Sequence, residues 1–103
     1  MIARMWHGAV PRDKADAYLL YLKRTGVSSL RATPGNRGVS LLRQDEGAAS
    51  HFLVISYWDS REAIRAFAGD DPEAARYYPE DADYLLELEP RVTHYEVLDS
   101  PEG

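Results

Sequence analysis

The sequence predicts a single α+β domain in which helices cover one face of a four-stranded antiparallel sheet. Three observations support this fold class. The chain has 103 residues, which suffice for one domain only. Four segments have the side-chain alternation of strands, and two stretches with helical spacing separate them in the order strand, helix, strand, strand, helix, strand. This order is that of a ferredoxin-like βαββαβ sandwich.

The first half of the chain is expected to form a strand, a helix and a second strand. The predicted ranges are residues 2–8, 14–24 and 39–42. Large side chains on both faces of the first range, with Arg4 and Trp6 on the same face, indicate a strand. Pro11 suits the start of a helix. Gly26 is expected to interrupt that helix, with one further turn around residues 28–32 before Pro34-Gly35-Asn36 breaks the chain.

The second half is expected to begin with a hairpin, because the polar connection Asp45-Glu46-Gly47 joins two apolar runs. The predicted elements after it are a strand at 51–58, a helix from 60 to about 69, short helices at 73–77 and 79–86, and a strand at 91–98. Asp59 is expected to cap the first of these helices, with Glu62 completing a capping box. Asp71-Pro72 is typical of a further helix start.

The strand at 51–58 is apolar or aromatic at nearly every position, which predicts that both of its faces are buried. Two helices can cover one face only, so Leu53, Ile55 and Tyr57 on the other face need a second cover. Leaving these side chains in water forfeits roughly 1.5–3 kcal/mol each. We therefore expect a homodimer that packs sheet against sheet as a closed two-fold α/β barrel. Residues 1–99 are expected to form the domain, and residues 100–103 a disordered tail.

Composition excludes several function classes. A formal charge of -5 disfavours nucleic acid and membrane surfaces as partners. Because the chain has no Cys, thiolate catalysis and Cys-ligated metal sites are excluded. No apolar run approaches the length of a membrane span, so a cytoplasmic location is expected.

Two segments connect the predicted fold with a known family. They are the junction Trp58-Asp59-Ser60-Arg61-Glu62-Ala63 and the closing strand Val92-Thr93-His94-Tyr95-Glu96-Val97. Together with the element order, they resemble the antibiotic biosynthesis monooxygenase family over nearly the whole chain. The resemblance implies a dimeric α/β barrel. The family includes cofactor-free monooxygenases of aromatic polyketides, quinol oxygenases, haem-degrading enzymes and members with no assigned activity.

The resemblance also implies a pocket between the sheet and the helices. In the polyketide oxygenases a Trp that closes strand three contributes to this pocket, and Trp58 matches that position. Three polar residues of the same pocket do not match: the Asn falls at Val54, the Tyr at Ile64 and the Arg at Tyr78.

The haem-degrading members resemble the chain less in their working residues. Their strand-one Asn falls at Met5 or Trp6, their helix-two Trp at Phe67 and their axial His near Arg76 or Tyr77. These departures disfavour haem binding and haem degradation.

Only three residues offer a base with a pKa near neutrality, namely His7, His51 and His94. We take His94 as the candidate catalytic base, because Glu96 lies two residues away on the same strand face and could orient its imidazole. The alternatives are a solvated His–Glu pair and, with only two ligands, a poor metal site. His7 is expected at an interface or sheet edge, and His51 is expected to be exposed.

Aromatic side chains supply the candidate substrate-binding residues. These are Trp6, Trp58, Phe67, Tyr77 and Tyr78. Such a set can line a flat apolar pocket, or it can be ordinary core. Arg4 and Arg76 are the available anchors for an anion, with surface ion pairs as the alternative.

The expected function is cofactor-independent monooxygenation of an apolar aromatic molecule, quinol-like or polyketide-like, with O2 as the oxidant. Without metal or flavin, the substrate itself must donate the electron, and the protein supplies a base, a donor for developing charge and a dry pocket. No cofactor and no metal are expected. The alternative is a non-enzymatic ligand-binding or stress-related dimeric barrel protein.

Overall fold

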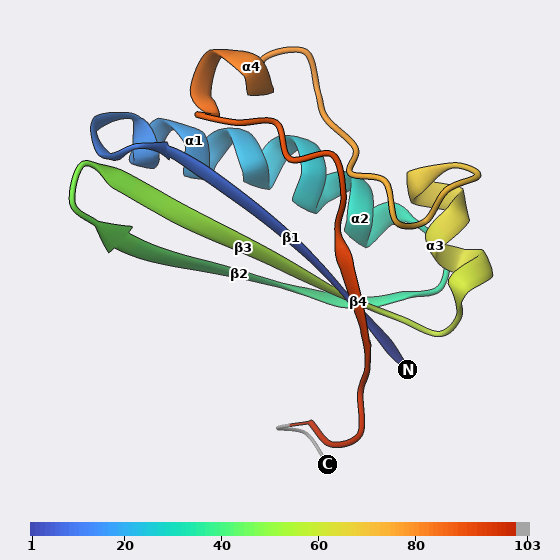
Figure 1. Ribbon diagram of the computed structural model, residues 1–103. Helices are drawn as coiled ribbons and strands as arrows, with labels where there is room; N and C mark the ends of the chain where they lie inside the picture. The colour runs from blue at the N-terminus through green and yellow to red at the C-terminus, as the bar shows by residue number, and fades with distance from the viewer. Residues whose placement is uncertain (101–103) are drawn as a thin grey trace.

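A computed structural model describes residues 1–100, and its elements follow the predicted order (Figure 1). The elements are β1 (Ile2–Pro11), α1 (Ala15–Leu22), α2 (Ser28–Ala32), β2 (Asn36–Glu46), β3 (Ala49–Trp58), α3 (Arg61–Ala68), α4 (Asp81–Tyr84) and β4 (Thr93–Glu96). The strands pair antiparallel in the order β2-β3-β1-β4. The predicted α+β fold class is therefore confirmed. Of the predicted tail, residues 101–103 lie outside the described residues.

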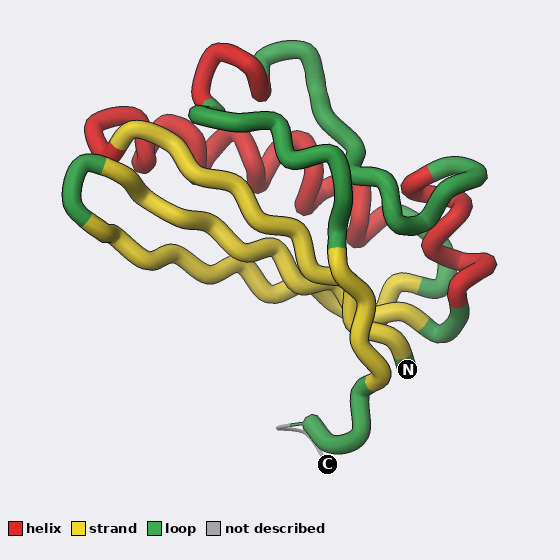
Figure 2. Tube along the Cα trace, in the orientation of Figure 1, coloured by secondary structure: helices red, strands yellow, loops and turns green. Residues whose placement is uncertain are grey.

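The helices lie on one side of the sheet, and no described helix covers the other side (Figure 2). Strand β3 has the predicted alternation: Phe52, Val54 and Trp58 face the helices and are buried. Leu53, Ile55 and Tyr57 point to the open face and are half-buried. None of the described helices is long and apolar enough to cross a membrane.

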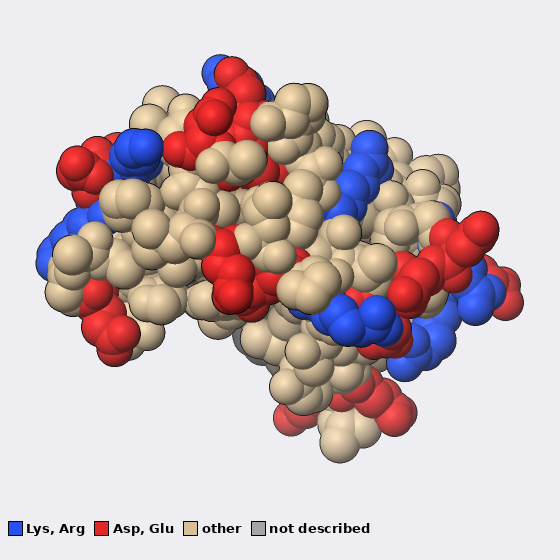
Figure 3. All heavy atoms as spheres, turned by 45° about the horizontal axis from the view of Figure 1, so that its top comes forward, with Lys and Arg blue, Asp and Glu red and all other residues tan. Residues whose placement is uncertain are grey.

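The core lies between the sheet and the helices and is largely aromatic. Tyr18, Phe52 and Trp58 are fully buried. The Tyr18 ring meets Phe52 edge-on at a centroid distance of 5.5 Å. Trp58 Nε1 donates a hydrogen bond to Ser56 Oγ at 2.8 Å, so the buried indole N–H is satisfied. The surface in Figure 3 mixes acidic and basic side chains.

The prediction that Gly26 interrupts the first helix is wrong. A π-helical segment, Lys23–Val27, joins α1 to α2, so the chain stays helical as far as Ala32. Glycine weakens a helix by about 1 kcal/mol, which packing can override. Here the buried side chains of Leu22, Val27 and Leu30 continue the apolar face across the glycine.

The short helix predicted at 73–77 does not form. Asp71 and Pro72 make a turn, in which Asp71 O accepts from Ala74 N at 3.1 Å. The backbone then pairs with a later segment: Ala75 N donates to Pro90 O at 2.9 Å, and Val92 N donates to Glu73 O at 2.8 Å. These long-range bonds satisfy the groups that a helix would have paired internally.

Several element boundaries also differ from the prediction. The helix predicted at 79–86 is limited to α4, because Leu86 N donates to Ala9 O at 2.8 Å and draws the chain toward β1. The cap of α3 is Ser60, whose Oγ accepts from Ala63 N at 3.2 Å, whereas Asp59 accepts from Arg37. The first three strands are longer than predicted, and β4 is shorter.

Candidate functional site

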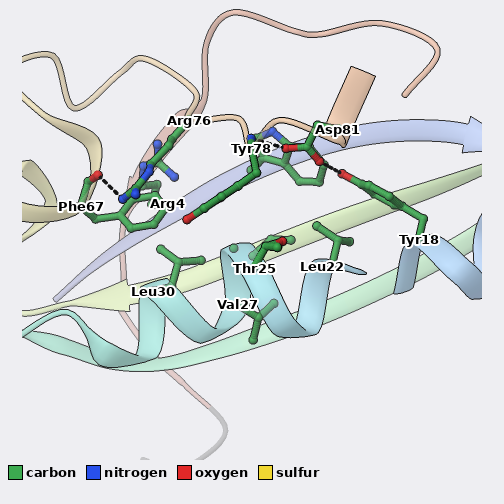
Figure 4. Close-up of a pocket in the computed structure, with 13 residues that line it drawn as sticks. Arg4, Tyr18, Leu22, Thr25, Val27, Leu30, Phe67, Arg76, Tyr78 and Asp81 are labelled. Carbon is green, nitrogen blue, oxygen red and sulfur yellow. Dashed lines mark hydrogen bonds between the residues drawn. The ribbon is translucent and has the colours of Figure 1, made fainter. Parts of the chain in front are cut away.

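A small cavity lies between the sheet and the helical segment α1–α2 (Figure 4). It is lined by Arg4, Trp6, Tyr18, Leu22, Thr25, Gly26, Val27, Leu30, Val54, Phe67, Arg76, Tyr78 and Asp81. Its volume of about 40 Å³ suffices for roughly two or three water molecules. An aromatic ligand can therefore enter only if a wall of the cavity moves.

The π-helical segment forms one wall of the cavity. Thr25, Gly26 and Val27 all line the cavity. The Thr25 hydroxyl donates to Tyr21 O at 2.7 Å, which supports the wide turn from its inner side. Single π turns inside α-helices are rare and occur frequently at functional sites.

Trp6 forms part of the sheet wall, and its indole lies over the backbone of β1. A Cβ atom at Gly8 would collide with this indole and would come within 2.8 Å of Leu85 Cδ2. Gly8 is thus the residue that gives the indole room. Trp6 Nε1 donates to Tyr77 Oη at 3.4 Å, and Tyr77 Oη in turn donates to Glu89 O.

Two guanidinium groups define one end of the cavity. Both lie close to the Phe67 ring, whose centre is 5.3 Å from Arg4 Cζ and 4.9 Å from Arg76 Cζ. Arg4 is only 3% exposed, and burial lowers its pKa to about 10, an effect that Glu73 opposes. The group remains cationic at neutral pH. Sequence reasoning treated Arg4 as a surface ion pair or an anion anchor, and its burial excludes the surface ion pair.

Tyr78 and Asp81 form the other polar part of the lining. Asp81 Oδ2 accepts from Tyr78 N at 2.6 Å, and Oδ1 accepts from the Tyr18 hydroxyl at 2.9 Å. Burial first, and then the charge of Asp81, raise the pKa of Tyr18 far above its ordinary value, so this hydroxyl stays a donor. The Tyr78 hydroxyl is buried and has no hydrogen-bond partner among the described residues.

Three of the predicted substrate-binding residues line the cavity, namely Trp6, Phe67 and Tyr78. Two others lie behind the lining. Trp58 packs against Phe67 at a centroid distance of 6.5 Å, and Tyr77 supports Trp6. Sequence reasoning did not single out Tyr18, Thr25 or Asp81. For Arg4, the strand alternation with Trp6 was the available signal of an inward position.

His94, the candidate base, lies outside the lining on the helix-facing side of β4. It stands opposite Arg4 in the β1–β4 pairing. Its side chain is 3% exposed, and Nδ1 lies 3.3 Å from Glu73 Oε2. The carboxylate that orients His94 is thus Glu73, while the expected partner Glu96 forms no hydrogen bond or ion pair with His94 in the described part of the chain. His94 Nε2 is buried with no partner among residues 1–100.

The environment of His94 predicts a dependence of stability on pH. Burial lowers the pKa of His94, and the bond to Glu73 opposes this change. Near pH 6, His94 therefore binds protons more readily in the unfolded chain than in the folded chain. The contribution of the buried neutral imidazole to the free energy of unfolding is complete above about pH 6.5 and is lost as the pH falls below this value. We expect the free energy of unfolding to fall more between pH 7.5 and 5 in the wild type than in His94→Gln. Urea denaturation at both pH values measures this difference, and an equal or smaller loss in the wild type contradicts it.

The two other histidines lie together on the open face of the sheet. His7 Nε2 is 2.9 Å from His51 Nδ1, and His7 Nδ1 is 2.6 Å from Glu89 Oε2. His51 was expected to be exposed, but it is half-buried, with 31% of its side chain exposed. Within the described part of the chain, no group of three or more His, Cys, Asp or Glu residues is arranged to hold a metal ion.

The model of the antibiotic biosynthesis monooxygenase family matches residues 1–77. The chain therefore belongs to this family. No curated protein matches the chain.

Solved structures of similar shape carry the same family name or that of a haem degrader. A crystal structure of an antibiotic biosynthesis monooxygenase has a TM-score of 0.67 at 19% identity, with 96% of this chain and 100% of that chain covered. A Nitrosomonas europaea protein whose title carries the same family name gives 0.66 at 22%, with 96% and 100% covered. The haem degrader MhuD of Mycobacterium tuberculosis, with two haems bound, gives 0.59 at 21%, with 97% and 98% covered. At these identities the likeness establishes the fold alone.

Proposed function

We propose that this protein is a homodimeric, cofactor-independent monooxygenase that takes an apolar aromatic molecule, quinol-like or polyketide-like, into the cavity between the sheet and the helices. One observation carries the proposal: the buried Tyr78 hydroxyl has no partner among the described residues and faces a cavity lined mainly by apolar side chains. A buried unpaired hydroxyl costs about 1–3 kcal/mol, which a polar group on a ligand can offset. Trp6, Phe67 and Val54 provide the apolar surface for the rest of such a ligand.

The proposed reaction needs a base, and His94 is the proposed base. With Nδ1–H donating to Glu73, the lone pair of the neutral imidazole is on Nε2, the atom without a partner. Burial keeps the pKa of His94 low, which favours the neutral form that can accept a proton. Because His94 is adjacent to the lining rather than in it, the proton would pass through one water molecule beside Arg4.

Oxidation of an anthrone by O2 balances in atoms and electrons without a cofactor. Deprotonation of an anthrone gives an electron-rich anion that reduces O2. One oxygen atom then forms the new carbonyl group, and the second leaves in water with the two hydrogens of the methylene carbon. The chain's own contribution is to exclude water, to orient the ring system with Tyr78 and to remove the proton.

A homodimer is part of the proposal, because the open face of the sheet is apolar. This face carries Met5, Ala9, Leu42, Leu53, Ile55, Tyr57 and Tyr95. Leu42 and Tyr95 are 46% and 55% exposed in the single chain. A second copy that packs against this face would remove these side chains from water.

Oxygen consumption tests the proposed activity. With a panel of anthrones and hydroquinones, the wild type is expected to consume O2. The His94→Gln variant is expected to have a lower kcat. The Tyr78→Phe variant is expected to have a kcat/KM about tenfold lower, which is the loss expected for one hydrogen bond to a charged group. Tyr95→Phe, which changes a hydroxyl outside the cavity, and His51→Gln are the matched controls and should keep full activity. Normal rates in both cavity-side variants would contradict the assignment.

A non-enzymatic ligand-binding role is the second candidate, and it is favoured by the absence of any histidine in the described lining of the cavity. Under this alternative, aromatic compounds quench the fluorescence of Trp6 but no O2 is consumed. Haem is a poor fit, because the described lining offers no axial imidazole. A Soret shift on titration with haemin would contradict that conclusion.

A further inference from the structure

We infer that the end of the cavity formed by Arg4, Arg76 and the Tyr78 hydroxyl is a recognition site for one anionic group, a carboxylate or a phenolate, on the aromatic ligand. This inference rests on the proposed ligand-binding role of the cavity and names the class of ligand.

Arg4 is the first observation that carries the inference. Its side chain is buried, and the one hydrogen bond that it forms with the described residues runs from Nη2 to Ala74 O at 2.9 Å. Nε is buried and has no partner. Among residues 1–100, no carboxylate lies within 4.0 Å of this guanidinium. The arginines that do form ion pairs are Arg12, Arg24, Arg37, Arg43, Arg61 and Arg91. The most buried cation thus has no carboxylate in direct contact, and Glu73 acts on it only at longer range, an arrangement that is costly unless a ligand completes it.

Arg76 and Tyr78 are the second observation. Arg76 Nη1 donates to Phe67 O at 3.1 Å, and within the described chain Arg76 forms no ion pair either. Its guanidinium also lies 5.2 Å from the centre of the Tyr78 ring. In Figure 4 the Tyr78 hydroxyl points away from Asp81 and toward the end of the cavity where Arg4 and Phe67 lie. Donors from three residues, one on β1 and two on the segment between α3 and α4, therefore converge on one end.

Asp81, the only carboxylate in the lining, does not compete for this role. Both of its oxygens accept hydrogen bonds, from Tyr18 and from the Tyr78 backbone. It also lies at the opposite end of the cavity in Figure 4. Two guanidiniums against one carboxylate leave the lining net positive, although the whole chain has a formal charge of -5. An anion is therefore attracted by this local arrangement and not by the overall charge.

The alternative explanation is that both guanidiniums only stack on Phe67 to stabilise the fold. A matched pair of probes separates the two explanations: 2-naphthoate, and 2-naphthamide, which has the same shape without the charge. Titration calorimetry on the wild type is expected to show naphthoate bound at least about tenfold more tightly, the effect of a charge-assisted hydrogen bond. In Arg4→Met this preference is expected to disappear, with the affinity for naphthamide changed by less than about threefold.

Arg76→Gln provides an independent variant, because its side chain lies closer to solvent and its loss should not prevent folding. It is expected to reduce the preference for naphthoate by about threefold or more. Arg65→Gln, an exposed arginine of α3 outside the lining, is the matched control and should keep the wild-type preference.

The possible outcomes distinguish this inference from the proposed function. Equal binding of naphthoate and naphthamide by the wild type leaves the cavity as a binding site and overturns the anion site alone. Binding of neither probe overturns the proposed ligand-binding role, and the anion site with it. If Arg4→Met does not fold, an unchanged preference in Arg76→Gln overturns the inference, and a reduced preference supports it.

Discussion

Replacing both Leu53 and Ile55 with glutamate is expected to convert the proposed homodimer into a monomer and to raise the dimer dissociation constant by about a thousandfold or more. Both side chains project from the middle of β3 onto the open face. In a two-fold dimer the double variant would bury four unpaired carboxylates and lose the apolar contact of four side chains, each change costing several kcal/mol. Sedimentation velocity at micromolar concentration measures the change in mass.

The matched control for this variant is Leu20→Glu. Leu20 is 65% exposed on α1, away from the open face of the sheet, so its replacement should leave the dimer intact. Circular dichroism should show a folded monomer for the double variant, because its side chains lie outside the core between the sheet and the helices. A wild-type protein that sediments as an 11.6 kDa species overturns the dimer.

Asp81→Ala is expected to lower the free energy of unfolding by about 2–4 kcal/mol, because a buried carboxylate with two donors is removed. The Tyr18 hydroxyl and the Tyr78 N–H would both be left without an acceptor in a buried site. For a domain of this size the melting temperature should fall by roughly 10–25 °C. Thermal denaturation followed by circular dichroism measures the change.

Two further variants test the cause of this loss. Asp83→Asn changes an exposed carboxylate on the same helix, α4, and should shift the melting temperature by little. In the background of Tyr18→Phe, which removes one of the two donors, Asp81→Ala should cost less than it does in the wild type, because the two residues are coupled. Additive effects of the two changes would contradict a bond between Tyr18 and Asp81.

The strand and helix order could be predicted because it depends on local periodicity. In β3 the side chains of Phe52 and Leu53 point to opposite faces simply because the backbone of a strand alternates, so the apolar pattern revealed a sheet with two faces to cover. The family resemblance added the location of the cavity. Trp6 and Phe67 line this cavity for the same reason, since both lie on the inward face of a periodic element.

Local signals failed where distant backbone groups compete for the same hydrogen bonds. Asp71-Pro72 is typical of a helix start. The backbone groups of Glu73 and Ala75 nevertheless form hydrogen bonds with the segment before β4, which is separated from them by α4. Gly26 is a sound helix end, yet packing on both sides of it keeps the chain helical. Neither outcome can be predicted from the neighbouring residues, because the groups that pair or pack with these segments lie elsewhere in the chain.

The amino-acid sequence by itself determined the layers of this protein, the inward and outward faces of its strands and the need to cover an apolar open face, since all three depend on the spacing of apolar side chains along the chain. Only the tertiary structure decided which polar groups meet at the cavity. It brings Arg4 from β1, Phe67 from α3 and Tyr78 from the following loop to one end of the cavity, and among the described residues it leaves the buried cation with no carboxylate in direct contact. Charge balance at a site depends on distances between residues far apart in the chain, and those distances exist only after folding.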